Sequence, residues 1–118
     1  MSDNVLTLDN KLNQAILSGK ALEAFDELYG DDVVMQENTG EPFAGKALNR
    51  EREIKFFSSI AQLHDIRMTA SAVNGDVSFS EWLMDLTFQN GQRHTMHQVA
   101  VRRWKDGKIV HERFYYKG

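Results

Sequence analysis

The sequence predicts an α+β fold, with helices in the first half of the chain and antiparallel strands in the second. Apolar residues recur at helical spacing up to about residue 63, and from Ile66 onward they alternate with polar residues. Three Asn-Gly or Asp-Gly pairs, at 74–75, 90–91 and 106–107, separate the alternating segments and are typical of β-hairpins. Helices on one side of such a meander, without a linker or repeat, indicate a single domain over residues 1–118.

Two short helices and a strand are expected at the start of the chain. The first helix carries an apolar stripe from Val5 to Ile16 and ends at Gly19. The second carries a stripe from Ala21 to Tyr29 and ends at Gly30. The segment "VVMQE", residues 33–37, is β-prone and bounded by "DD" and "NTGEP", which predicts a short strand.

A third helix is expected over residues 45–63. Its apolar side would consist of Leu48, Ile54, Phe57 and Ile60. Residues 50–53 alternate in charge and would form a solvated face.

The last three strands can be aligned through their turns. Two-residue turns at 90–91 and 106–107 place three rows on the helix-facing side: Trp82, Val99 and Phe114, then Met84, His97 and Tyr116, then Ser80, Val101 and Glu112. The opposite face would expose Leu83, Trp104, Ile109 and Tyr115, which suggests a homodimer through the outer face of the sheet. A bulge would shift these rows by one residue and exchange the faces.

The composition excludes several classes of function. The net charge is −3 and no stretch of Lys or Arg forms a basic stripe, which argues against nucleic acid as a partner. The chain has no cysteine, so disulfides and thiolate chemistry are excluded, and a cytoplasmic location is expected. No signal peptide and no apolar stretch long enough to cross a membrane is visible, so no membrane partner is expected.

Two segments resemble the NTF2-like superfamily, and within it the SnoaL-like and ketosteroid isomerase-like proteins. They are "SGKALEAFDELYGDDVVMQENTGEPFAGKALNRE" and "VAVRRWKDGKIVHERFYY". The resemblance implies a cone-shaped fold, in which a curved sheet wrapped by helices encloses a pocket, and a homodimer through the outer sheet face. It does not imply one reaction, because this fold carries isomerases, cyclases, hydrolases, dehydratases and non-catalytic binders.

Site residues follow from the resemblance position by position. Glu37 matches the carboxylate that ketosteroid isomerases use as a base. The Tyr and Asp that form the oxyanion hole of those enzymes fall on Leu12 and Val99, so both of these donors are absent. The Arg-x-Asp motif of limonene epoxide hydrolase-like members is also missing, since the comparable strand reads "SEWLMDL".

Each candidate has a structural alternative. Glu37 is a catalytic base or a carboxylate tied to the "NTG" turn, and His97 is a general acid or a core histidine. Tyr116 would be an alternative proton donor, and Glu112 is a pocket residue or the partner of Arg103 or of a helix. The remaining candidates line a ligand pocket or pack a core: Met35, Trp82, Met84, Val99 and Phe114.

No metal or cofactor is expected. His94 and His97 alternate to opposite faces of one strand, and His111 is expected on the outer face. Three imidazoles in this arrangement do not converge on one ion.

Two hypotheses about function follow. The first is a cofactor-independent acid/base enzyme of the isomerase, cyclase or dehydratase type, acting on a small apolar carbonyl compound. The second is a non-catalytic ligand-binding or dimeric accessory protein, which the missing oxyanion donors favour.

Overall fold

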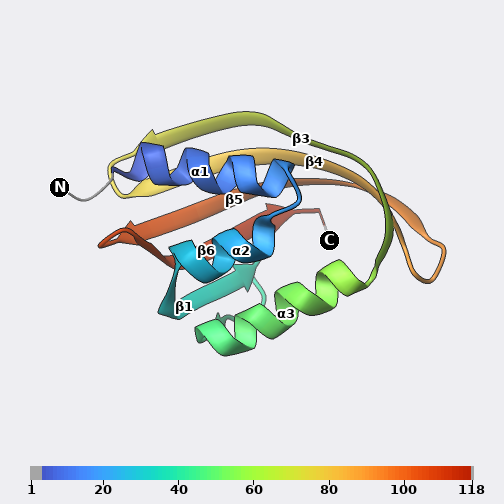
Figure 1. Cartoon of the computed structure of the whole chain (residues 1–118), viewed down its shortest axis with the longest axis horizontal. Helices are drawn as coiled ribbons and strands as arrows, with labels where there is room; N and C mark the ends of the chain where they lie inside the picture. Colours follow the sequence, from blue (N-terminus) through green and yellow to red (C-terminus); the bar gives the residue numbers. More distant parts are fainter. Residues whose placement is uncertain (1–3, 118) are drawn as a thin grey trace.

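The protein was analysed as a computed structural model that describes residues 4–117. Three helices precede most of the strands: α1 (Val5–Leu17), α2 (Ala21–Leu28) and α3 (Lys46–Ser58). The strands are β1 (Tyr29–Glu37), β2 (Phe43–Ala44), β3 (Ile60–Asn74), β4 (Val77–Phe88), β5 (Arg93–Lys105) and β6 (Lys108–Tyr116). They form one sheet in the order β2-β1-β6-β5-β4-β3 (Figure 1), which confirms the predicted α+β class.

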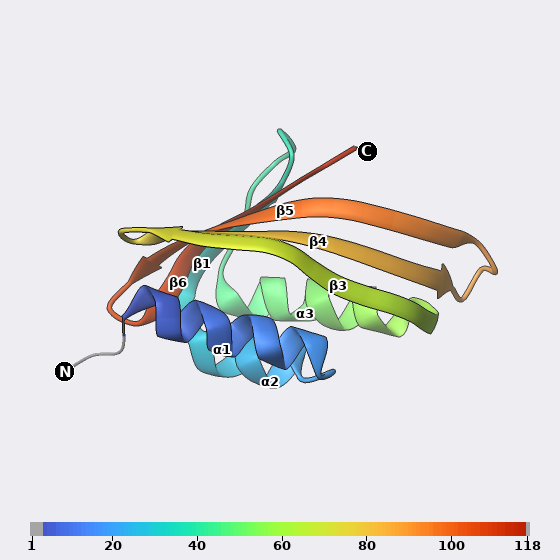
Figure 2. The same ribbon diagram turned by 90° about the horizontal axis from the view of Figure 1, so that it is seen from above.

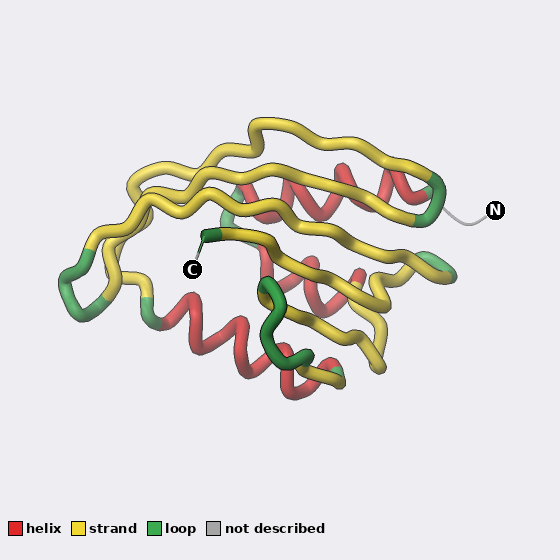
Figure 3. The backbone as a smooth tube through the Cα atoms, turned by 180° about the vertical axis from the view of Figure 1, so that it is seen from behind, coloured by secondary structure: helices red, strands yellow, loops and turns green. Residues whose placement is uncertain are grey.

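The helices cover one face of a curved sheet. Figure 2 shows all three helices on the same side of the strands, and Figure 3 shows the long strands β3, β4 and β5 bending together. All neighbouring strands pair antiparallel except β1 and β6, which are parallel. The packed core lies under α1 and α2 and includes Leu12, Phe25, Val33, Trp104 and Ile109.

The end of α1 follows the sequence prediction. Ser18 is the C-cap, and Gly19 follows it with a φ of +78°. The Lys20 N–H donates to the Ala15 carbonyl and the Gly19 N–H to the Ile16 carbonyl, at 2.8 and 3.3 Å. This pair of bonds is the Schellman motif, which satisfies carbonyls that the helix leaves open.

Tyr29 corrects the predicted end of the second helix. The helix ends at Leu28, and Tyr29 already belongs to β1, where its side chain is buried. The strand therefore begins four residues earlier than the apolar run "VVMQE" indicates. As a consequence the Tyr29 ring stacks on Phe25 of the preceding helix, with 4.4 Å between ring centroids.

The third helix differs from its prediction in length and in the face that it buries. It ends at Ser58, and Ile60 begins β3, so residues 60–63 are strand rather than helix. Leu48, Ile54 and Phe57 are 39–44% exposed, whereas Asn49 is fully buried. Arg52 and Glu53 are half-buried, so part of the predicted solvated face points inward, whereas Glu51 is exposed.

The turns explain why the predicted strand register is wrong. The Asp106-Gly107 turn has two residues with positive φ, as a type I′ turn requires. At 90–91 only Gly91 has positive φ, and the connection spans residues 88–92 between the paired Thr87 and Arg93. This odd number of loop residues shifts β5 by one position against β4.

A bulge between β5 and β6 adds a second shift. Trp104 pairs with Ile109 but Arg103 pairs with His111, so Val110 is the extra residue. The two shifts leave β4 and β6 in their predicted phase and exchange the faces of most of β5. The predicted rows containing His97, Val99 and Val101 are therefore wrong on that strand. Gln98, Ala100 and Arg102 take the helix-facing side instead.

The region around the last turn is buried rather than exposed. Trp104 is 4% exposed and Ile109 is fully buried in the core under α1 and α2. Their predicted place on the outer face is therefore wrong. Trp104 lies on the exchanged face of β5, and Ile109, on the turn side of the bulge at Val110, pairs with it. Among residues 4–117 no helix combines the length and hydropathy that a bilayer crossing requires.

Candidate functional site

A cavity of about 530 Å³ lies between the helices and the sheet. Its walls come from all three helices and from the helix-facing sides of five strands. Most of the wall is apolar, as in ligand sites generally, and much of it is aromatic or contains methionine: Phe25, Met35, Phe56, Phe57, Trp82, Met84, Met96 and Phe114.

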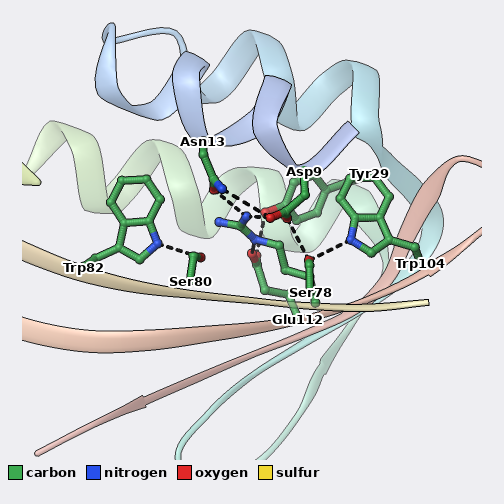
Figure 4. Close-up of polar contacts among 9 residues, drawn as sticks. Asp9, Asn13, Tyr29, Ser78, Ser80, Trp82, Trp104 and Glu112 are labelled. Atoms are coloured by element: carbon green, nitrogen blue, oxygen red, sulfur yellow. Dashed lines mark hydrogen bonds and ion pairs between the residues drawn. The ribbon is translucent and has the colours of Figure 1, made fainter. Parts of the chain in front are cut away.

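A buried ionic cluster closes one end of this cavity. Arg102 on β5 is 2% exposed and donates from Nε to Glu112 Oε2 at 2.8 Å. Its Nη1 donates to Asp9 Oδ1 at 2.8 Å and to Asn13 Oδ1 at 2.7 Å, both on α1. Figure 4 shows Asp9, Asn13 and Glu112 gathered from the helix side and the sheet side. The cluster is possible because the exchanged face of β5 brings Arg102 under α1.

Further hydrogen bonds fix the two carboxylates of the cluster. The Tyr29 hydroxyl donates to Glu112 Oε1 at 2.6 Å, and the Ser78 hydroxyl donates to Asp9 Oδ1 at 2.7 Å (Figure 4). The Trp104 indole N–H donates to the Ser78 hydroxyl at 2.9 Å. The Asn13 amide donates to Asp9 Oδ2 at 3.2 Å, so every carboxylate oxygen of the cluster accepts at least one hydrogen bond, which lowers the cost of burying both acids.

The cluster changes the proton affinity of its members. Burial disfavours the charged form of Arg102, but Glu112, Tyr29 and Asp9 raise its pKa above the ordinary value. Burial, and next the charge of Glu112, raise the pKa of Tyr29 well above its ordinary value. The Tyr29 phenol therefore stays protonated and acts as a hydrogen-bond donor.

Glu53 on α3 is a carboxyl group in the cavity wall whose pKa is raised into the neutral range. It lines the wall and takes part in no hydrogen bond or ion pair within residues 4–117. Burial raises its pKa to about 7, the charges of Glu112 and Glu37 add to the effect, and Arg52 opposes it. A carboxyl group with a pKa near neutrality exchanges protons readily at pH 7, as acid/base catalysis requires.

Glu37, which the resemblance matches to the base of ketosteroid isomerases, lies at the rim of the cavity. Glu37 is 49% exposed and pairs with Arg52, whose Nη2 lies 3.4 Å from Glu37 Oε2. Arg52 also donates to Asn49 Oδ1 and stacks on the Phe43 ring. Burial and the nearby Glu37 raise the pKa of Tyr116, which does not line the cavity.

The structure distributes the other predicted residues between two faces. Five of them line the cavity: Met35, Trp82, Met84, Glu112 and Phe114. His97 and Val99 lie on the outer face with Leu83 and Tyr115, where they border a separate depression of about 320 Å³. Their predicted position beside the pocket is wrong, because it relied on the uncorrected register. Glu112 pairs with Arg102 and Tyr29 rather than with Arg103.

Sequence reasoning missed Glu53, Arg102 and Tyr29. Glu53 follows the buried Asn49 by four residues, so the two lie on one helical face, but nothing in the sequence marks that face as the inner one. The predicted register puts Val101 on the helix-facing side and therefore its neighbour Arg102 on the outer face, the reverse of what the structure shows. Tyr29 was assigned to a helix. Within the described residues, no group of three or more His, Asp or Glu side chains has the arrangement of a metal site.

The fold is shared with known structures. A SnoaL-like polyketide cyclase candidate from Mesorhizobium loti matches with a TM-score of 0.86 and 24% identity over 97% of this chain and 100% of its own. A polyketide cyclase candidate from Pseudomonas putida matches with a TM-score of 0.74 and 25% identity, over 93% of this chain and 89% of its own. An isomerase candidate from Bacillus subtilis matches with a TM-score of 0.76 and 18% identity, over 95% of this chain and 85% of its own.

The family assignment comes from the sequence match. A comparison with curated proteins gives no significant match. The model of the SnoaL-like domain matches residues 6–116, which is nearly the whole chain. Together with the three-helix, curved-sheet architecture and its cavity, this match shows that the chain belongs to the SnoaL-like domain family of the NTF2-like fold.

Proposed function

We propose that this protein is a cofactor-independent acid/base enzyme that acts on a small, mostly apolar carbonyl compound. Glu53 would take a proton from the carbon next to the carbonyl group and return it to the same or another carbon. The net reaction is then proton exchange, or an isomerisation in which no atom is gained or lost. Cyclisation or dehydration would begin with the same proton removal: in a cyclisation the carbanion adds to a second carbonyl carbon and its oxygen takes the proton back from Glu53, and in a dehydration the C–O bond on the next carbon breaks as the C=C bond forms and the hydroxyl group takes that proton and leaves as water.

A single observation carries this proposal. Glu53 is a carboxyl group in a largely apolar cavity, it has no hydrogen-bond or ion-pair partner in the described part of the chain, and burial raises its pKa to about 7. Glu37 is exposed and ion-paired, so Glu53 is the better candidate for proton acceptor. Protein carboxylates positioned in this way contribute roughly 10²–10⁴-fold to proton-transfer rates.

The experiment follows hydrogen–deuterium exchange beside the carbonyl of β-tetralone, a bicyclic ketone of suitable size, by NMR in deuterated water. We expect protein-dependent exchange that rises with pH through about 7 and then levels off, because Glu53 must be ionised to accept a proton. Glu53→Gln should lower the rate by at least about 100-fold. Glu51→Gln, on the exposed side of the same helix, is the matched control and should leave the rate unchanged.

A second candidate function is non-catalytic ligand binding. It is favoured by Leu12, which lines the cavity where the related isomerases place a tyrosine donor. In that case a ketone stabilises the protein thermally and is recovered without deuterium. Equal exchange rates in the wild type and Glu53→Gln would remove the catalytic proposal and leave this one.

We also propose a homodimer through the outer face of the sheet, with a corrected set of residues. Leu83, His97, Val99 and Tyr115 border the depression on that face, and Phe79 is 38% exposed nearby on β4. Trp104 no longer belongs to the set. Sedimentation at micromolar concentration should give a dimer for the wild type and a monomer for Leu83→Glu. A wild-type monomer would contradict the proposal.

A further inference from the structure

Arg102 has a hydrogen-bond donor that the ionic cluster does not use. Its Nε and Nη1 bind Glu112, Asp9 and Asn13. The third nitrogen, Nη2, has no hydrogen-bond partner among residues 4–117. Nη2 is nevertheless not fully covered by protein atoms. In this it differs from His111 Nδ1, which is fully covered and has no hydrogen-bond partner in the described chain. Since Arg102 is 98% buried and lines the cavity, its unused N–H group opens into the cavity.

We infer that Arg102 Nη2 is the donor that receives the carbonyl oxygen of the ligand, and that the cavity selects neutral carbonyl compounds over carboxylates. The guanidinium is held by three hydrogen bonds to two elements, α1 and β6, so its free edge has a fixed direction. A donor fixed in advance needs no reorganisation when negative charge develops on the oxygen. This inference rests on the proposed function for the identity of the reacting group.

The charges around Arg102 set the preference for a neutral ligand. Asp9 and Glu112 carry two formal negative charges against the single positive charge of the guanidinium, and Glu53 lines the same cavity. A carboxylate ligand would meet a surplus of negative charge at short range. A neutral carbonyl oxygen accepts the N–H bond without that repulsion.

The other donors of the cavity are engaged or free to move. The Tyr29 hydroxyl donates to Glu112, and the Trp82 indole N–H donates to the Ser80 hydroxyl at 2.8 Å (Figure 4). Arg52 is held by Asn49 and Glu37 at the rim. Gln98, two residues before Ala100 on the same face of β5, lines the cavity without a hydrogen bond within the described chain. Its amide is therefore the competing donor, and a matched control.

The test measures the infrared stretch of β-tetralone labelled with carbon-13 at the carbonyl group, bound to the wild-type protein. A bond to Arg102 should lower the frequency relative to the same ketone in hexane. Gln98→Met should retain the shift, and Asp9→Asn/Arg102→Met/Glu112→Gln, which removes all three charges together, should lose it. An unshifted wild-type carbonyl, or a shift lost only in Gln98→Met, would overturn the inference.

Affinity gives a second measurement. Tetralin has the same skeleton without the oxygen, so the ratio of ketone to hydrocarbon affinity isolates the hydrogen bond. This ratio should fall about tenfold in the triple variant, as expected for a bond to a charged donor worth roughly 1.5 kcal/mol or more. Tetralin-β-carboxylate should bind the wild type at least tenfold more weakly than the ketone at pH 8. Equal affinities would contradict the charge argument.

Wild-type protein alone can decide the matter if the triple variant does not fold. The guanidinium protons of a buried arginine can be followed by NMR, and the Nη2 protons of Arg102 should shift when β-tetralone binds. The two proposals can also fail separately. A lowered carbonyl frequency without deuterium exchange would contradict the proposed activity but support Arg102 as the donor. Deuterium exchange without a lowered frequency would support the activity and contradict the role of Arg102.

Discussion

At the scale of single residues, Glu53 shows how environment rather than residue type makes a site. The sequence places it in a run of alternating charges, where Glu51 and Glu53 look equivalent. The structure exposes Glu51 and turns Glu53 toward an apolar cavity next to Glu112. Burial then disfavours the ionised form, which raises the pKa to about 7.

The raised pKa of Glu53 predicts a pH-dependent cost to stability. The folded protein holds the Glu53 proton up to about pH 7, whereas the unfolded chain releases it near the ordinary glutamate pKa of 4.5. Stability from this group is therefore present at low pH and is lost as the pH rises from 4.5 through 7. Glu53→Gln should stabilise the protein by about 1–3 kcal/mol at pH 8 and much less at pH 5.

Urea unfolding of the wild type and Glu53→Gln at the two pH values measures this effect. Glu51→Gln serves again as the control and should change stability by less than about 0.5 kcal/mol at either pH. A Glu53→Gln variant that is less stable than the wild type at pH 8 would contradict the interpretation. The same substitution is expected to abolish turnover, which is the usual exchange of stability for activity.

At the scale of elements, α3 is oriented by its N-terminal contacts rather than by an apolar stripe. The buried Asn49 side chain donates to the Phe43 and Gly45 carbonyls, both at 2.9 Å, which ties the helix to the β2 segment. The N-cap Gly45 has φ +102° and ψ 140°, a backbone conformation that residues other than glycine rarely adopt. Because the inner face of α3 borders a cavity and not a packed core, polar residues can occupy it.

Gly45 therefore predicts a sharp substitution effect. Gly45→Asn should cost about 1–3 kcal/mol from backbone strain alone, since an added Cβ atom would meet nothing within 4 Å. Gly19 is the matched position: it has φ +78° and equally open space, but it occupies the left-handed C′ position that Asn tolerates. Gly19→Asn should cost only a few tenths of a kcal/mol. Thermal unfolding of both variants measures the difference, and equal costs would rule out this explanation.

At the scale of the whole molecule, the Arg102 cluster joins elements that are far apart in the sequence. Asp9 and Asn13 come from α1, Ser78 from β4, Arg102 from β5 and Glu112 from β6. Buried ion pairs of this kind rarely add net stability, but breaking one leaves an uncompensated charge. The cluster therefore fixes the position of α1 over the sheet and, with it, one end of the cavity.

Removing one charge should cost more than removing all three. Arg102→Met leaves Asp9 and Glu112 without their cation and should lower the free energy of unfolding by about 3–5 kcal/mol. Asp9→Asn/Arg102→Met/Glu112→Gln should recover most of that loss, because its remaining groups are neutral and can bond to Ser78, Asn13 and Tyr29. Urea unfolding compares the two variants. A triple variant less stable than the single one would show that the charges themselves stabilise the fold.

The α+β class, the family resemblance and the order of the three helices and five of the six strands could be predicted from the sequence, whereas the short strand β2 was not predicted. The Gly19 helix stop and the Asp106-Gly107 turn were readable because they are local properties of the backbone. The faces of β4 and β6 also followed, so Trp82, Met84, Glu112 and Phe114 were found at the cavity. The register of β5 was not readable: the five residues between the paired Thr87 and Arg93 shift its pairing with β4 by one position, the bulge at Val110 shifts its pairing with β6 by one, and neither leaves a mark in the alternation.

Which groups make the candidate site depends on long-range packing. The face of β5 determines that Arg102 meets Asp9 and Glu112 and that His97 does not reach the cavity. The docking of α3 determines that Glu53 is half-buried in the cavity wall and that Glu51 is exposed. These are long-range properties, since burial and partners depend on which distant segments pack together, and they set the charge and proton affinity on which the proposed chemistry depends.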